Sequence, residues 1–112
     1  MRIMVWPMDI TTVTPAVSIA MPALIRFCQR HPIKQLALFG SVLRADFHAD
    51  SDIDVLVEFL PNVVIGWNIV TMADELSTLL GRPVDLRTPA ELSRHIRQQV
   101  LSEAWVIYES TG

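Results

Sequence analysis

The sequence is short of the features that mark disulfide-linked, membrane-spanning and nucleic-acid-binding proteins. It holds one cysteine, Cys28, in 112 residues, which excludes an internal disulfide and fits a reducing compartment. Its longest uncharged stretch, residues 10–25, contains two prolines and is shorter than the ~20 apolar residues of a membrane helix. A net charge of −3 argues against nonspecific binding along nucleic acid, which needs a basic surface.

What the chain does have is enough apolar material for one core. Hydrophobic residues make up 51% of the sequence and charged residues 19%, and no repeat or low-complexity tract divides it. We therefore expect a single domain over residues 1–112, in which residues 1–20 form a variable N-terminal extension. The first nine residues lack the sustained apolar run of a signal peptide, so we expect a cytoplasmic protein with no membrane contact.

Hydrophobic periodicity predicts alternating helices and strands, and hence a small mixed sheet packed with helices, of the α/β (α+β) class. The apolar pattern places Leu24, Ile25 and Cys28 on the inner side of a first helix. Asp74 and Glu75 lie off the apolar stripe of a second helix, where solvent is the simplest neighbour. The expected elements are a helix from between Pro15 and Pro22 to about Arg30, strands 34–39 and 52–59, a helix 67–80, a helix after the capping box Thr88–Glu91, and a strand 106–108.

The segment that begins Asp52-Ile53-Asp54 carries two acids at strand spacing. Side chains alternate along a strand, so Asp52 and Asp54 point the same way, about 7 Å apart. Carboxylates at that separation suit Mg²⁺, which prefers oxygen ligands, waters and substrate phosphates. The alternative is the wet face of a half-buried strand.

Upstream, the apolar run of residues 36–39 ends in Gly40-Ser41, which predicts a strand that turns into a helix. Glycine lets a phosphate approach the backbone, and the free N–H groups at a helix start favour an anion. Ser41 could also be an ordinary N-cap. The combination of this turn with two strand carboxylates favours nucleotide chemistry over either structural reading.

A third carboxylate follows in the short strand-like run of residues 82–87, where Asp85 faces away from Val84 and Leu86. If this run lies beside the Asp52 strand, Asp85 joins the same acidic face. Clustered carboxylates raise one another's pKa unless a cation compensates, which indicates a metal site or a functional base. The alternative is a solvated strand aspartate.

These residues resemble the minimal nucleotidyltransferase family of the polymerase-β-like superfamily, whose pattern is a Gly-Ser pair, a ten-residue gap and Asp-x-Asp. Gly40, Ser41, Asp52 and Asp54 match that pattern, and the likeness extends over about residues 21–110. The resemblance implies a polymerase-β-like nucleotidyltransferase fold. It also implies ATP as substrate and one or two Mg²⁺ ions held by Asp52, Asp54 and Asp85.

The chain departs from the family in the phosphate loop, where Val42 replaces a frequent basic residue. Arg44 matches the usual arginine, but Ala45 stands where glycine is common. Alanine has less access to positive φ, which predicts a less open loop and lower phosphate affinity. By resemblance, Gly40, Ser41 and Arg44 bind the nucleotide. His48 lies in the same connection and is interpreted as a solvated loop histidine.

The resemblance implies an antitoxin that transfers AMP from ATP to a tyrosine of a helical HEPN ribonuclease, and forms a hetero-oligomer with it. Ala45 keeps a second class open, in which the chain neutralises its toxin by binding alone. A free-standing transferase that acts on a small molecule is a third reading. The sequence selects neither the nucleobase nor the acceptor, and the apolar residues 3–6 could serve an interface, the core or an edge strand.

Overall fold

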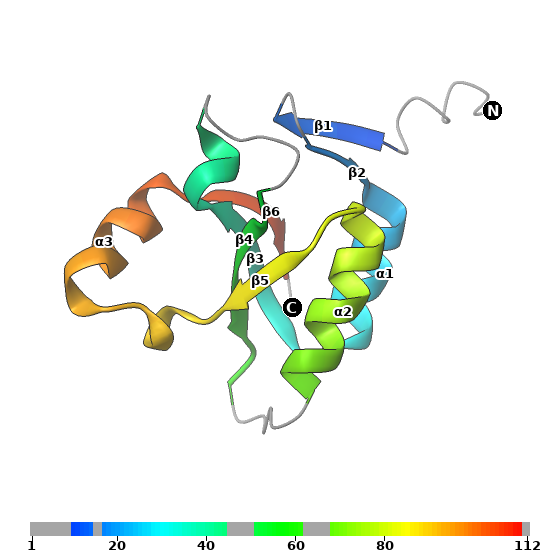
Figure 1. Cartoon of the computed structure of the whole chain (residues 1–112). Helices are drawn as coiled ribbons and strands as arrows, with labels where there is room; N and C mark the ends of the chain where they lie inside the picture. Colours follow the sequence, from blue (N-terminus) through cyan, green and yellow to red (C-terminus); the bar gives the residue numbers. More distant parts are fainter. Residues whose placement is uncertain (1–9, 15–16, 45–50, 62–67, 111–112) are drawn as a thin grey trace.

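The computed structural model describes residues 10–14, 17–44, 51–61 and 68–110. At its centre lies a four-stranded mixed sheet in the order β5-β4-β3-β6 (Figure 1). β3 pairs antiparallel with both β4 and β6, and β5 pairs parallel with β4. The strands are β3 (Ile33–Phe39), β4 (Ile53–Phe59), β5 (Val84–Arg87) and β6 (Trp105–Glu109).

The expected fold class is confirmed, with helices on both faces of the sheet. α1 (Met21–Arg30) and α2 (Asn68–Leu80) lie side by side on one face, and α3 (Arg94–Glu103) lies on the other (Figure 1). The β4–α2–β5 connection is a crossover between parallel strands, the arrangement that such strands require. None of the helices in the described part of the chain reaches the length and apolarity of a bilayer-spanning helix.

The main core fills the space between the sheet and the pair α1 and α2. Strict alternation along β4 sends Ile53, Val55 and Val57 into this core at 0% exposure. Met72 and Leu76 meet them from α2, also at 0% exposure. The predicted apolar stripe of residues 67–80 is therefore confirmed, and burial of this apolar surface is what holds the helix pair on the sheet.

Helix α1 agrees with the prediction in its extent but only partly in its inward face. Leu24 and Cys28 are buried together with Phe27, whereas Ile25 is 38% exposed, so its inward placement was wrong. Burial raises the pKa of the Cys28 thiol to about 12, which makes it inert at neutral pH. Cys28 thus acts as the small buried apolar residue that the sequence indicated.

The segment before α1 forms a hairpin that the sequence reading missed. β1 (Ile10–Thr14) pairs antiparallel with β2 (Val17–Ala20), and α1 begins directly after it. α1 therefore begins within the expected range between Pro15 and Pro22, and only the strand pair before it was not predicted. Residues 3–6, for which an interface, a core or an edge-strand role was considered, lie outside the described residues.

Glu75 is not simply solvated as expected, because it links α2 to the end of α1. Its carboxylate lies 2.6 Å from the Arg30 guanidinium and 3.1 Å from Nε2 of His31. The His31 ring also packs against Phe27, with ring centroids 4.9 Å apart. This ion-pair network ties the two helices of the core face together.

The capping box at Thr88 is real but opens a 3₁₀ turn, Pro89–Glu91, and not the predicted helix. The Thr88 N–H donates to Glu91 at 2.8 Å. α3 begins only at Arg94; Leu92, which precedes it, is buried, whereas Ile96 within it is 47% exposed. Arg97 is half-buried and donates to the carbonyl oxygens of Pro89 and Leu92, which precede the helix.

Candidate active site

Two of the three predicted acids lie next to each other in the sheet. Asp54 of β4 is the register partner of Asp85 of β5. Since paired residues of parallel strands project to the same side, both carboxylates belong to the face that α3 covers. Asp52 directly precedes β4 and is exposed. The expectation that Asp85 joins the acidic face of the Asp52 strand is confirmed in its placement.

Gly40 approaches the Asp54 carboxylate so closely that no side chain fits there. A Cβ built on Gly40 would overlap Asp54 Oδ2. Gly40 also has φ of +75°, which disfavours any residue with a Cβ. The sequence reading assigned this glycine to phosphate approach, and the structure adds that it gives room to the carboxylate itself.

The turn that Gly40 begins is shorter than the helix that the sequence predicted. It is a 3₁₀ turn over Gly40–Leu43, closed by a hydrogen bond of 2.9 Å from the Arg44 N–H to the Ser41 carbonyl. Ser41 is half-buried, and Arg44 is exposed at the end of the turn. Ala45 and His48 lie outside the described residues.

The pKa of Asp54 is raised above its ordinary value. Partial burial is the largest cause, and the negative charge of Asp85 is the second. Asp52 adds to the rise, whereas Arg87 and Arg44 oppose it. These groups therefore lie near enough to act on one carboxylate electrostatically. A nearby cation would stabilise the ionised form of a carboxylate that has other negative charges beside it, as expected at a functional site.

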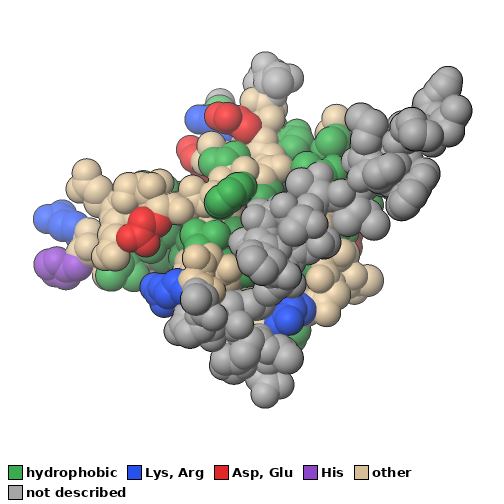
Figure 2. Space-filling view, turned by 90° about the horizontal axis from the view of Figure 1, so that it is seen from above, with side chains coloured by type: hydrophobic (Ala, Val, Ile, Leu, Met, Phe, Trp, Pro, Cys, Tyr) green, Lys and Arg blue, Asp and Glu red, His purple; other side chains and the backbone are tan. Residues whose placement is uncertain are grey.

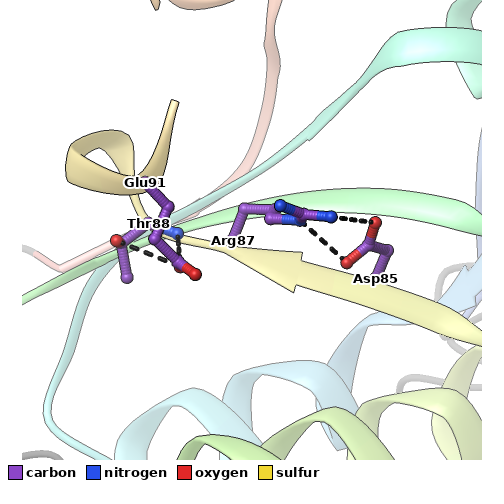
Figure 3. A network of polar contacts seen from close by, with 4 residues as sticks. All are labelled: Asp85, Arg87, Thr88 and Glu91. Atoms are coloured by element: carbon purple, nitrogen blue, oxygen red, sulfur yellow. Dashed lines mark hydrogen bonds and ion pairs between the residues drawn. The ribbon is translucent and has the colours of Figure 1, made fainter. Parts of the chain in front are cut away.

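Arg87 occupies both oxygens of Asp85 in this structure (Figure 3). Its Nε donates to Oδ1 at 3.0 Å and its Nη2 to Oδ2 at 3.2 Å. The sequence reading missed this partner, although a signal was present, because Asp85 and Arg87 are two residues apart in a strand and so share a face. The Arg87 guanidinium therefore supplies a positive charge beside the acidic residues.

Three hydrogen bonds support the parallel register that brings Asp54 and Asp85 together. The Val84 N–H donates to Ser77 Oγ at 3.0 Å, and Ser77 Oγ donates in turn to the Ala73 carbonyl at 2.7 Å. The Ile53 N–H donates to the Pro83 carbonyl at 2.9 Å. Ser77 therefore anchors the start of β5 to the end of α2, which the sequence pattern did not indicate.

The donor set suits a hard divalent cation by its chemistry. Carboxylate oxygens, such as those of Asp52 and Asp54, are ligands that Mg²⁺ prefers. Because Gly40 has no side chain, the Asp54 carboxylate can lie directly against the turn. Among the described residues, no three acidic, histidine or cysteine side chains are already gathered as a metal site. Asp85 would have to turn from Arg87 to serve as a third donor, so its metal role stays a prediction.

Comparison with known proteins decides the family. The family model of the nucleotidyltransferase domain matches residues 23–107, which include the Gly40 turn and all three acids. The chain belongs to the nucleotidyltransferase domain family. It is a nucleotidyltransferase, as its resemblance to the minimal members predicted.

One similar relative is the protein adenylyltransferase MntA of Thermococcus cleftensis. The two are 33% identical over 82 residues, which cover 71% of this chain and 78% of the relative. The similarity thus extends over most of both proteins, well beyond the short motif around the acids.

Solved structures support the fold. A toxin–antitoxin structure with AMP-PNP aligns with a TM-score of 0.64 at 22% identity, over 81% of this chain and 74% of that one. A complex of an MNT antitoxin with a tri-AMPylated HEPN toxin of Shewanella oneidensis gives a TM-score of 0.58 at 22% identity, over 80% and 70%. At this identity the likeness establishes the nucleotidyltransferase fold.

Proposed function

We propose that this nucleotidyltransferase transfers AMP from ATP, in the presence of Mg²⁺, to a tyrosine of a HEPN-family ribonuclease toxin. The protein would thereby act as the antitoxin of that toxin in the cytoplasm. Two comparisons support this proposal. A relative over most of the chain is named as a protein adenylyltransferase. An MNT antitoxin of the same fold occurs in complex with an AMPylated HEPN toxin.

The reaction forms one bond and breaks one. The tyrosine oxygen attacks the α-phosphorus of ATP, the bond from that phosphorus to the oxygen that bridges to the β-phosphate breaks, and pyrophosphate leaves with the electron pair. The hydroxyl proton passes to a base, for which Asp85 is the candidate if it does not serve as a metal ligand. Gly40 and Ser41 would hold the leaving phosphates, with Arg44 as a nearby positive charge.

Asp52 and Asp54 would hold the cation at the start of β4, and Asp85 is the candidate for a third donor. When bound there, Mg²⁺ would neutralise the negative charge of the triphosphate and of the leaving pyrophosphate. The two assignments of Asp85, base or ligand, are alternatives. A third-ligand role predicts that Asp85→Asn weakens metal binding, whereas a base role predicts a lost limb in the pH–rate profile.

The observation that carries the proposal is the position of one carboxylate. Asp54 is held between a glycine that has room for it and a second acid in register on the next strand. Its raised pKa reflects partial burial and the charge of Asp85. A wet-face aspartate would need neither a glycine at positive φ beside it nor an acid as its neighbour in the sheet.

The test uses labelled ATP, Mg²⁺ and the protein encoded by the adjacent reading frame. The wild-type chain is expected to label that partner covalently. Asp52→Asn and Asp54→Asn are expected to lower labelling by about a thousandfold or more, because the metal donors are lost. Glu58→Gln is the matched control, since Glu58 is exposed on the same face of β4, away from the turn.

The outcomes separate the three readings of the sequence. Labelled partner that depends on Asp54 supports the adenylyltransferase antitoxin. Neutralisation of the toxin without label, also by the Asp54 variant, would mean masking by contact alone. Turnover of ATP with a small hydroxyl compound and no protein acceptor would point to a free-standing transferase.

A further inference from the structure

A pocket of about 210 Å³ adjoins the candidate active site on the side of α3. Phe39 at the end of β3 and Ile96 and Val100 of α3 give it apolar walls. Its polar lining comes from Gly40, Arg44, Gln99 and Glu103. Another hollow lies between α1 and α2, on the opposite face of the sheet from the acids.

The pocket and the acidic site share one backbone segment. Gly40 lines the pocket, and the position of its missing Cβ is occupied by the Asp54 carboxylate. Phe39 is the register partner of Asp54, so both project to the α3 side of the sheet. A ligand with phosphates at the Gly40 turn can therefore extend its remaining part into this pocket without leaving the protein surface.

The walls suit a flat ring that carries polar edges. Phe39 is half-buried, and Ile96 is 47% exposed in the free protein, so a ring between them would cover apolar surface that water now contacts. In the view from above, hydrophobic side chains are visible in the middle of the described surface, among scattered acidic and basic ones (Figure 2). Binding pockets with apolar walls and a few placed polar groups are typical of small-molecule sites.

The polar end of the pocket is a paired amide and carboxylate. Gln99 Nε2 donates to Glu103 Oε1 at 3.1 Å, one turn apart on α3. A carboxylate only accepts hydrogen bonds, so Glu103 favours a ring edge that presents an N–H donor and disfavours one that presents a carbonyl oxygen. Both side chains are exposed, and both line the pocket.

We propose that this pocket holds the nucleobase of the donor nucleotide, and that Glu103 favours bases with an exocyclic amino group, such as adenine. The inference rests on the proposed function, because it takes the phosphates to lie at the Gly40 turn. It assigns the base selection for which the sequence motif gave no residue.

The test compares a ligand that carries a base with one that does not. The α,β-methylene analogue of ATP and inorganic tripolyphosphate are titrated, each with Mg²⁺, by calorimetry. Ile96→Ala is expected to weaken binding of the analogue about fivefold and that of tripolyphosphate less than about twofold, because only the base loses a wall. Leu101→Ala is the matched control on α3, since Leu101 is 49% exposed and lies outside this pocket.

A second arm tests the amino-group preference. The wild-type protein is expected to bind the adenosine analogue about tenfold more tightly than the inosine analogue, which has a carbonyl at that position. Glu103→Gln is expected to narrow this ratio toward one, because an amide can both donate and accept.

Each result decides a different claim. If the wild-type chain binds neither the ATP analogue nor tripolyphosphate, the proposed function fails and the base pocket with it. If it binds both, and Ile96→Ala binds the analogue as tightly as wild type, only the base pocket is overturned. An unchanged adenosine-to-inosine ratio in Glu103→Gln overturns the role of Glu103.

Discussion

The two faces of the central sheet differ in how much buried apolar packing covers them. Among the residues that the structure describes, fourteen buried ones form one cluster on the face covered by α1 and α2, whereas three form the cluster on the face of α3. α3 itself contributes no fully buried residue. The first face therefore supplies most of the hydrophobic stabilisation, and the second leaves half-buried surface free for polar groups and a ligand. This division predicts that stability and activity can be damaged separately.

Truncation of one leucine on each face should give the largest contrast in stability. Leu36→Ala, at a residue 0% exposed in the main core, should lower the free energy of unfolding by about 3 kcal/mol. Leu92→Ala on the α3 face should cost about 1–2 kcal/mol, because its smaller cluster can collapse more easily. Urea unfolding measures both. Equal losses would mean that the α3 face is as rigidly packed as the core face.

Gly40 and Gly81 both have φ of +75° and sharpen the same comparison, since they share a backbone conformation but have different neighbouring atoms. Gly40→Ala should cost about 2 kcal/mol or more and displace Asp54, because strain and a clash with its carboxylate add together. Gly81→Ala meets no atom within 4 Å and should cost only about 1 kcal/mol. Unfolding free energy and nucleotidyl transfer are measured on both variants. Full transfer by Gly40→Ala would contradict the placement of Asp54.

Ser77 offers a test of the link between the core face and the acidic pair. Ser77→Ala should lower stability by about 1–2 kcal/mol, because the Val84 N–H loses its acceptor, and it should also lower transfer. Thr78→Ala is the neighbouring control, since Thr78 Oγ1 also donates to a carbonyl one turn back but is exposed and anchors no strand. A loss of stability with unchanged transfer would show that β5 keeps its register without Ser77.

The smallest expected effect is a gain in folding stability when Asp54 is replaced by asparagine. The raised pKa of Asp54 means that the folded state holds its proton more tightly than the unfolded state does. Folding is then unpenalised below the unfolded pKa, and stability falls as pH rises through the folded pKa. Asp54→Asn should therefore be slightly more stable than the wild type at pH 7, with the gain reduced by solvent screening, and should lose this advantage in acid. Thermal melts across pH measure the difference in stability between the two proteins. If Asp54→Asn were less stable than the wild type at pH 7, the raised pKa of Asp54 would be contradicted.

Local pattern was enough for the elements that position the site. Alternation along β4 set the faces of Asp54 and its apolar neighbours, and the apolar stripe of α2 with Gly81 behind it set that helix. Alternation also set the polar face of Asp85 within its own strand, but only the structure shows that this strand pairs with β4 and so places Asp85 beside Asp54.

The features that local pattern missed depend on contacts between distant segments. The β1–β2 hairpin lies in a stretch whose prolines also suit a helix start, so only its pairing distinguishes the two. The ion pair between Arg30 and Glu75 joins residues of two helices that no local periodicity relates. The capping box at Thr88 satisfies the same hydrogen bonds in a short 3₁₀ turn as in a helix, which hid the later start of α3.

The parallel register of β4 and β5 makes the acidic pair and the core interdependent. A shift of β5 by one residue would turn Asp85 toward the apolar interior and expose Val84 and Leu86. A point substitution of Asp85 would therefore remove the third acid and leave the architecture unchanged. A register shift of β5, by contrast, would remove the acid from the site and also destabilise the whole domain.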